Sequence, residues 1–326
     1  MNTLFIFILI SFLEKILNYE PPDSLYSLIL DKVRKDIVKN AIINLPKRRN
    51  VDILQMLISM SNEKKENNLT DIESAFLIYM WIGENIEISC YKIYAEDESP
   101  TTVYKNGIGS VTGISSLFNT MCSHLNIKSG SIQGFTKMKS YTTSIKTIET
   151  RHMWNFILLN NTKYLIDSSL GAGFCIDYQF NKNYIPLYFG TKPEILIKTH
   201  FPKDEEFQLL EKNIQNYQWK NMVFRDRYFY LNGLKSINPD VTYFCLTNID
   251  KISIEYDSSN MDISFYGIMH YDNYRELVFN KVTYNKGNAE ISLKNWNKIY
   301  RHPDKFELYI GKNKDTSIIF TPSSCQ

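Results

Sequence analysis

One stretch of the chain decides the fold: His152-Met153-Trp154-Asn155-Phe156-Ile157-Leu158-Leu159-Asn160-Asn161-Thr162-Lys163-Tyr164-Leu165-Ile166-Asp167. Two apolar runs flank the short, asparagine-rich segment Asn160-Asn161-Thr162. Apolar runs separated by such a loop predict an antiparallel β-hairpin. The hairpin places His152 and Asp167 on paired strands.

Helices are predicted before this hairpin. Thr70 and Glu73 have the spacing of a capping box, so a buried helix is expected from Asp71 to about Asn85. A further helix is expected from about Thr112 to Leu125, because its apolar residues fall on one stripe. Nearer the N-terminus, Ser24 is expected to cap a helix with apolar residues at a period near 3.6, and residues 51 to about 60 are expected to form another.

After about Arg227 the pattern changes to short apolar or alternating runs. Eight strands are expected there: Tyr228–Leu231, Thr242–Leu246, Ile252–Tyr256, Ile263–Met269, Glu276–Val282, Glu290–Leu293, Phe306–Ile310 and Ser317–Phe320. Short strands with turn residues between them predict an Ig-like β-sandwich. The fold class is therefore α+β, a helix against an antiparallel sheet. The predicted parts are a signal peptide at 1–19, a helical extension at 20–66, a core domain at 67–215 and a sandwich at 216–326.

Composition and residue spacing argue against nucleic-acid binding, a cofactor and a metal ion. The 326 residues are 44% apolar and 22% charged, which is typical of a globular chain, and the net charge is +2. No basic block is longer than Lys47-Arg48-Arg49, so nucleic acid is not expected as a partner. The five cysteines contain no CxxC pair, and His124, His200, His270 and His302 show no metal-type spacing. We therefore expect no cofactor and no metal ion.

The N-terminus suggests export. Leu4 to Leu13 is an uncharged run too short to span a bilayer, which needs about 20 residues, so no transmembrane segment is expected there. Its length is typical of the apolar region of a signal peptide, although no basic residue precedes it. A secreted protein is expected; the alternative is a cytoplasmic protein whose first helix packs on the domain. Sequons at Asn68 and Asn160 are compatible with secretion.

Several motifs in order resemble the transglutaminase-like superfamily, of the kyphoscoliosis-peptidase type. The resemblance covers roughly residues 71–210. It rests on the helix Asp71–Ile86, on Gly109-Ser110-Val111-Thr112-Gly113 at the place of Gly-x-Cys-x-Gly, on His152-Met153-Trp154-Asn155, on Ile166-Asp167-Ser168-Ser169-Leu170-Gly171-Ala172-Gly173, and on His200-Phe201-Pro202 near the end of the domain. It implies a papain-like core with a Cys-His-Asp site, in which His152 and Asp167 are retained.

The same resemblance puts Val111 at the position of the nucleophilic cysteine. Valine has no ionisable proton and cannot attack a carbonyl. Ser110 and Thr112 point elsewhere, because each helical residue turns the side chain by about 100°. Cys122 lies about 16 Å further along the helix axis. Cys175 could fold back near the site after the glycine-rich bend.

Three functions remain open. The leading hypothesis is a catalytically inactive transglutaminase-like protein, a pseudoenzyme, that binds a protein partner. The second is an active cysteine peptidase or acyltransferase with a displaced nucleophile, for which Cys175 is the candidate. The third is a structural protein that uses its C-terminal sandwich. His152 and Asp167 could also be only a buried structural pair.

Overall fold

The structure is a computed structural model that describes residues 22–323 apart from 91–97, 140–146, 177, 226, 242, 246–250, 258–264, 272–273, 279–281, 293–304 and 311–315. Residues Tyr26–Asn213 form one compact unit, and those from Ile214 onward, with the described residues up to Leu25, form the other. The predicted signal peptide at 1–19 lies outside the described residues. No helix among the described residues is long and apolar enough to span a membrane.

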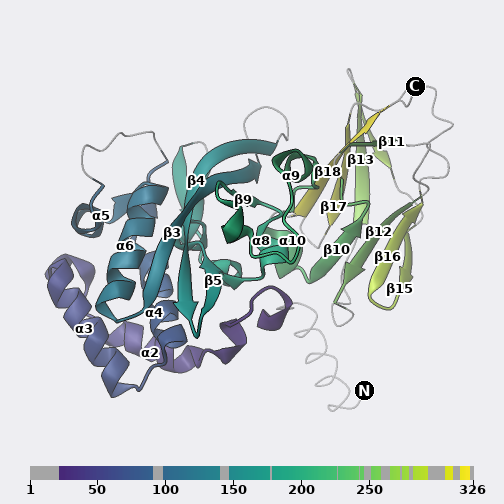
Figure 1. Ribbon diagram of the computed structural model, residues 1–326. Helices are drawn as coiled ribbons and strands as arrows, with labels where there is room; N and C mark the ends of the chain where they lie inside the picture. The colour runs from purple at the N-terminus through teal and green to yellow at the C-terminus, as the bar shows by residue number, and fades with distance from the viewer. Residues whose placement is uncertain are drawn as a thin grey trace, which may run out of the picture. The chain divides into compact units, whose positions relative to one another are not determined.

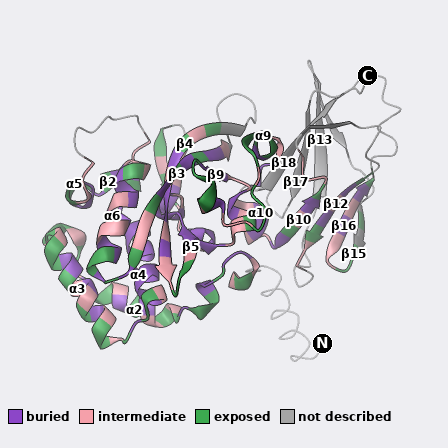
Figure 2. Ribbon diagram, in the orientation of Figure 1, coloured by how far each residue is buried: buried purple, intermediate pink, exposed green. Residues whose placement is uncertain are grey.

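Three helices begin the larger unit: α2 (Lys35–Asn44), α3 (Ile53–Glu66) and α4 (Asp71–Asn85). The predicted capping box at α4 is present: Thr70 accepts from the Glu73 backbone N–H, and the Glu73 carboxylate accepts from the Thr70 backbone N–H. Helix α4 is buried over most of its length. Helix α3 is amphipathic, with Met56 and Met60 buried and exposed residues on its other side (Figure 2).

The prediction of a helix that starts at Ser24 is wrong. Residues 23–32 form two 3₁₀ turns, Asp23–Leu25 and Leu30–Lys32, and the α-helix starts only at Lys35. Ser27 explains the interruption. Its Oγ accepts from the backbone N–H groups of Ile29 and Leu30, and its backbone forms a bridge with Thr191. Hydroxyl bonds of this kind compete with helical hydrogen bonding.

A five-stranded antiparallel sheet forms the centre of this unit (Figure 1). Its strand order is β8 (Phe189–Thr191), β5 (Thr162–Ile166), β4 (Thr147–Leu159), β3 (Lys128–Lys139), β9 (His200–Pro202). The predicted hairpin is β4–β5, and Asn160 and Asn161 both have positive φ, of 48° and 61°. Two such residues in succession form the tight turn that matches strand twist.

Helix α6 (Val111–His124) packs on β3 and β4, as Figure 1 shows, and contacts α4. The predicted α+β core, a helix against an antiparallel sheet, is therefore present. Smaller elements surround it: β1 (Glu87–Ile88) parallel to β2 (Ile108–Gly109), α5 (Pro100–Asn106), α7 (Ser168–Ala172), the hairpin β6 (Gly173–Ile176) and β7 (Gln179–Lys182), α8 (Pro193–Leu196), and 3₁₀ turns at Arg48–Asn50, Pro186–Tyr188 and Glu205–Gln208. The residues from Tyr26 to 66, predicted as a separate extension, belong to the same compact unit as the sheet.

In the described residues from Ile214 onward, the other unit has two short helices, α9 (Asn216–Asn221) and α10 (Arg227–Leu231), and two sheets. The four-stranded sheet has the order β10 (Leu234–Asn238), β12 (Lys251–Tyr256), β16 (Asn288–Ser292), β15 (Val282–Asn285). The five-stranded sheet has the order β11 (Tyr243–Cys245), β18 (Thr316–Ser323), β17 (Lys305–Ile310), β13 (Phe265–Tyr271), β14 (Tyr274–Val278).

Two predictions for this unit are corrected. The segment Tyr228–Leu231 was expected to be a strand but belongs to α10. Its apolar run is too short for periodicity to distinguish a strand from a helical turn. Phe229 and Tyr230 are buried as part of the helix. Strand β10, which pairs with β12, was not expected. The Ig-like sandwich stays a prediction.

Candidate functional site

Val111 is the first residue of α6, the position where a helix best stabilises a negative charge. Ser110 caps this helix, because its Oγ accepts from the backbone N–H groups of Thr112 and Gly113 at 3.2 and 3.3 Å. The Ser110 hydroxyl donates to the Glu98 carboxylate. A cysteine at this helical position would have a lowered thiol pKa, since unpaired N–H groups and the helix dipole favour the thiolate. Val111 gives the position an aliphatic side chain instead.

Three buried side chains meet beside this helix end. His152 Nε2 lies 2.6 Å from Asp167 Oδ2, and His200 Nε2 lies 3.0 Å from the same oxygen. Their exposed side-chain fractions are 4%, 0% and 1% for His152, Asp167 and His200. The structure therefore brings the two predicted residues His152 and Asp167 into contact, and adds His200.

The Asp167 carboxylate is held on both of its oxygens. Oδ1 accepts from the Leu170 backbone N–H at 2.9 Å and from the Ser169 hydroxyl at 2.7 Å, so Asp167 also caps α7. Burial by itself raises the pKa of Asp167. Electrostatic attraction by His152, together with hydrogen bonds from His152 and His200, outweighs burial and holds the pKa well below its ordinary value. Asp167 is thus a carboxylate that accepts from both imidazoles.

His200 is neutral in this environment. Burial lowers the pKa of His200, and the hydrogen bond to Asp167 only partly opposes that effect. Its Nε2 carries the proton that Asp167 accepts, and its Nδ1 lies 2.8 Å from Thr199 Oγ1. These two contacts fix the orientation of the ring.

Gly134 leaves room for β9, the strand that carries His200. Gly134 on β3 lies opposite His152 on β4 and opposite Pro202 on β9. A Cβ at this position would lie 2.2 Å from the Phe201 carbonyl oxygen and 2.7 Å from the Trp154 ring. Only glycine allows the three strands to approach this closely.

Asn155 positions the helix relative to the histidine. Its buried Nδ2 lies 3.1 Å from the Ser115 carbonyl oxygen, 2.9 Å from Ser115 Oγ and 3.1 Å from Asn119 Oδ1, all on α6. Because Asn155 and His152 are on one strand, these bonds hold Val111 and His152 at a fixed separation. The amide therefore links the nucleophile position to the imidazole.

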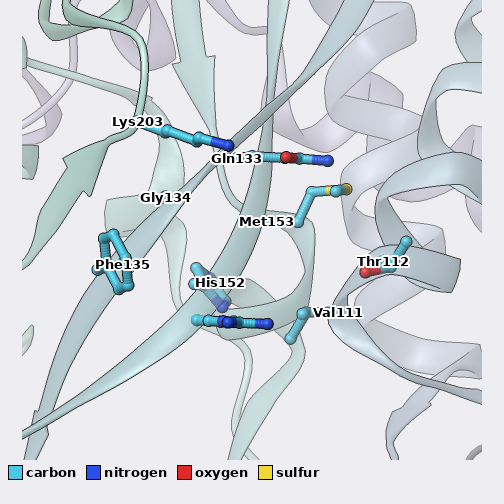
Figure 3. A pocket seen from close by; sticks show the side chains of 9 residues that line it. Val111, Thr112, Gln133, Gly134, Phe135, His152, Met153 and Lys203 are labelled. Atoms are coloured by element: carbon cyan, nitrogen blue, oxygen red, sulfur yellow. The ribbon is translucent and has the colours of Figure 1, made fainter.

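A cavity of about 470 Å³ opens at this point (Figure 3). Figure 3 shows Val111 and Thr112 on one wall and His152 facing them. The complete lining is Val111, Thr112, Gln133, Gly134, Phe135, Arg151, His152, Met153 and Lys203. Its size is typical of ligand pockets, and it can hold one or two side chains of a peptide.

Comparison with known proteins agrees with this architecture. Residues 58–166 match the family model of the transglutaminase-like superfamily. This chain contains a transglutaminase-like domain. The matched segment includes α4, α6, His152 and the whole β4–β5 hairpin, and ends one residue before Asp167.

The domain is similar to that of human kyphoscoliosis peptidase, with 28% identity over 185 residues, 55% of this chain and 28% of the relative. Hillarin of Drosophila melanogaster is 22% identical over 234 residues, 66% of this chain and 29% of the relative. The chain thus spans less than a third of the length of these relatives. A crystal structure of red sea bream transglutaminase aligns with 10% identity and a TM-score of 0.28 over 89% of this chain and 58% of that one, which is too distant to add to the argument.

The thiols of the transglutaminase-like domain do not reach the site. Cys175 forms a disulfide with Cys90, so it is not the free nucleophile that the glycine-rich bend could have supplied. Cys122 is fully buried, and burial raises the pKa of its thiol far above the ordinary value. Neither cysteine offers a reactive thiolate.

His200 is the residue of this site that sequence reasoning missed. It lies 33 residues after Asp167 and reaches the same oxygen through strand pairing between β9 and β3. The distance in sequence from His200 to His152 and Asp167 gives no indication that the three residues share a site. A signal lies in the His200-Phe201-Pro202 motif, which by the family resemblance indicates only the end of the domain.

Proposed function

We propose that the transglutaminase-like domain is a catalytically inactive protein-binding module that uses the former catalytic cleft. One observation carries this proposal: Val111 stands at the start of α6 and shares a cavity with His152, at the place where the family resemblance puts the nucleophile. The imidazole and carboxylate of a cysteine acyl-transfer site remain, but no thiol among the described residues accompanies them. A shaped cavity without a nucleophile favours binding over turnover.

The alternative of a displaced nucleophile is less well supported. It required Cys175 as a free thiol near His152, and Cys175 is paired with Cys90. The relatives named kyphoscoliosis peptidase make peptide segments the reasonable class of ligand for the cleft. Since the chain spans only part of those relatives, that ligand class is part of the proposal.

Restoring the thiol tests whether the site is a disabled cysteine site. In Val111→Cys, the new thiol stands at the helix N-terminus and faces His152, so we expect alkylation by iodoacetamide at neutral pH about tenfold faster than that of a free cysteine. The matched control is Ser123→Cys. Ser123 is exposed at the far end of the same helix, about 18 Å along the axis from Val111 and away from the helix N-terminus. Chelator in the buffer prevents oxidation of the thiols.

The alkylation rates of the variants distinguish a site that lacks only its nucleophile from one that has lost its catalytic geometry. Fast alkylation of Val111→Cys, ordinary alkylation of Ser123→Cys, and loss of the difference in Val111→Cys/His152→Gln would support a site that lacks only its nucleophile. Equal rates in the two single variants would refute it. Wild-type protein that incorporates amines into glutamine substrates, or cleaves peptides, would refute inactivity.

Filling the cavity tests the binding role. Thr112 is exposed and lines the cavity, so Thr112→Tyr should block it without disturbing the core. The control is Ser123→Tyr at the exposed far end of α6. Partners that copurify with wild type and Ser123→Tyr but not with Thr112→Tyr would identify the cleft. Partners retained by all three proteins would place binding elsewhere.

We also propose that the protein is secreted. The Cys90–Cys175 disulfide supports this, because such bonds persist in oxidising compartments. Asn160, the first residue of its sequon, is exposed at the turn of the β4–β5 hairpin. N-terminal sequencing of protein from its native source should find the chain beginning after about residue 18. An intact Met1 on protein from cytosol would refute export.

A further inference from the structure

The cluster of His152, Asp167 and His200 contains one more residue than a Cys-His-Asp site needs. One nitrogen of each imidazole and one carboxylate oxygen all lie within 4.8 Å of one another, and all three residues are buried. Both Nε2 atoms point at the same Asp167 oxygen, at 2.6 and 3.0 Å. The three side chains thus converge on one point. His152 is on β4, Asp167 directly follows the end of β5, and His200 is the first residue of β9.

Two imidazole nitrogens and one carboxylate oxygen are a donor set typical of zinc sites. Zinc binds histidine nitrogen and carboxylate oxygen, and a site with three protein ligands keeps a fourth position for water or substrate. Divalent cations that demand only oxygen ligands, such as magnesium and calcium, fit this set poorly. The chemistry of the cluster therefore selects a zinc-type cation.

The ligand atoms are already oriented by further hydrogen bonds. Asp167 Oδ1 is held by the Leu170 N–H and the Ser169 hydroxyl, which leaves Oδ2 free to face the two rings. His200 Nδ1 lies against the Thr199 hydroxyl, which directs Nε2 inward. Supporting contacts of this kind accompany metal-binding histidines and carboxylates and raise their affinity.

The spacing is close to what zinc requires. Ligand atoms around a tetrahedral zinc ion with bonds of about 2.0–2.1 Å lie about 3.3 Å apart. The two nitrogen–oxygen distances are shorter, so the rings must withdraw by a few tenths of an ångström. His152 lines the open cavity, so its ring is the one with room to move.

We propose that His152, Asp167 and His200 form a binding site for one divalent cation of the zinc type. This departs from the expectation that the chain binds no metal, and it does not depend on whether the cleft binds a protein. The competing reading is a plain hydrogen-bond network, in which both imidazoles donate to the carboxylate and no cation enters.

The first test is zinc titration of the full chain after treatment with chelator and desalting, followed calorimetrically. Wild type should bind one zinc ion per chain. Asp167→Asn and His200→Gln should each weaken binding by at least tenfold, because loss even of a supporting contact costs about 10–100-fold. The control His124→Gln, at the exposed end of α6, should bind as wild type does. Circular dichroism of each variant establishes that it is folded.

A second measurement needs no variant. X-ray absorption of the zinc-loaded wild type should show two imidazole nitrogens, oxygen ligands and no sulfur. Absence of saturable zinc binding would overturn the proposal. So would binding that persists in both folded ligand variants, a spectrum with sulfur ligands, or a spectrum without imidazole.

Discussion

Glu73 is the buried carboxylate whose replacement should most clearly weaken the helical part of the domain. Its side chain is 1% exposed and accepts from Arg34 Nε and Nη2 at 2.6 and 2.8 Å. It also accepts from the Arg34 and Thr70 backbone N–H groups at 3.1 and 2.9 Å. Glu73 therefore joins the residue before α2 to the first turn of α4. The perturbation we choose is Glu73→Gln.

The magnitude follows from the pKa of Glu73. The hydrogen bond from Arg34 is the largest cause that lowers this pKa, from 4.5 to about 2, and burial opposes it. At about 1.4 kcal/mol per pH unit, the full shift corresponds to about 3 kcal/mol. Arg34 is 46% exposed, so solvent screening reduces this, and we expect a loss of about 1–2 kcal/mol. For a unit of this size, Tyr26–Asn213, Tm should fall by about 2–8 °C.

The sign of the pH dependence is fixed by the lowered pKa. A carboxylate with a lower pKa in the folded state contributes stability above its unfolded pKa and loses it as pH falls to the folded pKa. The contribution of Glu73 should be complete above about pH 5 and should disappear between about pH 4.5 and 2. The variant should therefore approach wild type in acid.

Differential scanning calorimetry at pH 7 and at pH 3 measures both effects. Glu66→Gln is the control, because Glu66 is exposed at the end of α3 and this substitution removes the same charge as Glu73→Gln. It should leave Tm nearly unchanged. A Glu73→Gln protein as stable as wild type at pH 7, or a difference in Tm that is as large at pH 3 as at pH 7, would refute the reasoning.

Three further predictions concern the elements that hold the site. Asn155→Ala removes the bonds to α6 and should cost about 1–3 kcal/mol in urea unfolding, whereas an unchanged midpoint would mean that these bonds are dispensable. Gly134→Ala should push β9 away, since its Cβ would lie 2.2 Å from a backbone oxygen; amide hydrogen exchange around His200 should rise, and unchanged protection would contradict the close approach. Cys90→Ser/Cys175→Ser opens a loop of 85 residues and should lower stability by up to about 4–5 kcal/mol by the chain-entropy estimate, measured by thermal unfolding against reduced wild type, which should match the variant.

Local sequence determined several elements of this protein. The capping box at Thr70 fixed the start of α4, and the tandem asparagines fixed the turn between β4 and β5. These features depend on residues within a few positions of each other, so backbone chemistry alone specifies them. The hairpin pattern likewise brought His152 and Asp167 close together, and the helix expected from about Thr112 begins at Val111, whose place as the nucleophile position came from the family resemblance.

Long-range contacts decided the rest. The turn at Ser27 depends on strand β8, more than 160 residues away in sequence, and it ended the helix that periodicity favoured. His200 joins Asp167, and Cys175 joins Cys90, only because sheet pairing and the packing of α7 bring distant segments together. Sequence spacing carries no information about such meetings, because the free energy that drives them comes from burying the whole core and not from any pair of residues.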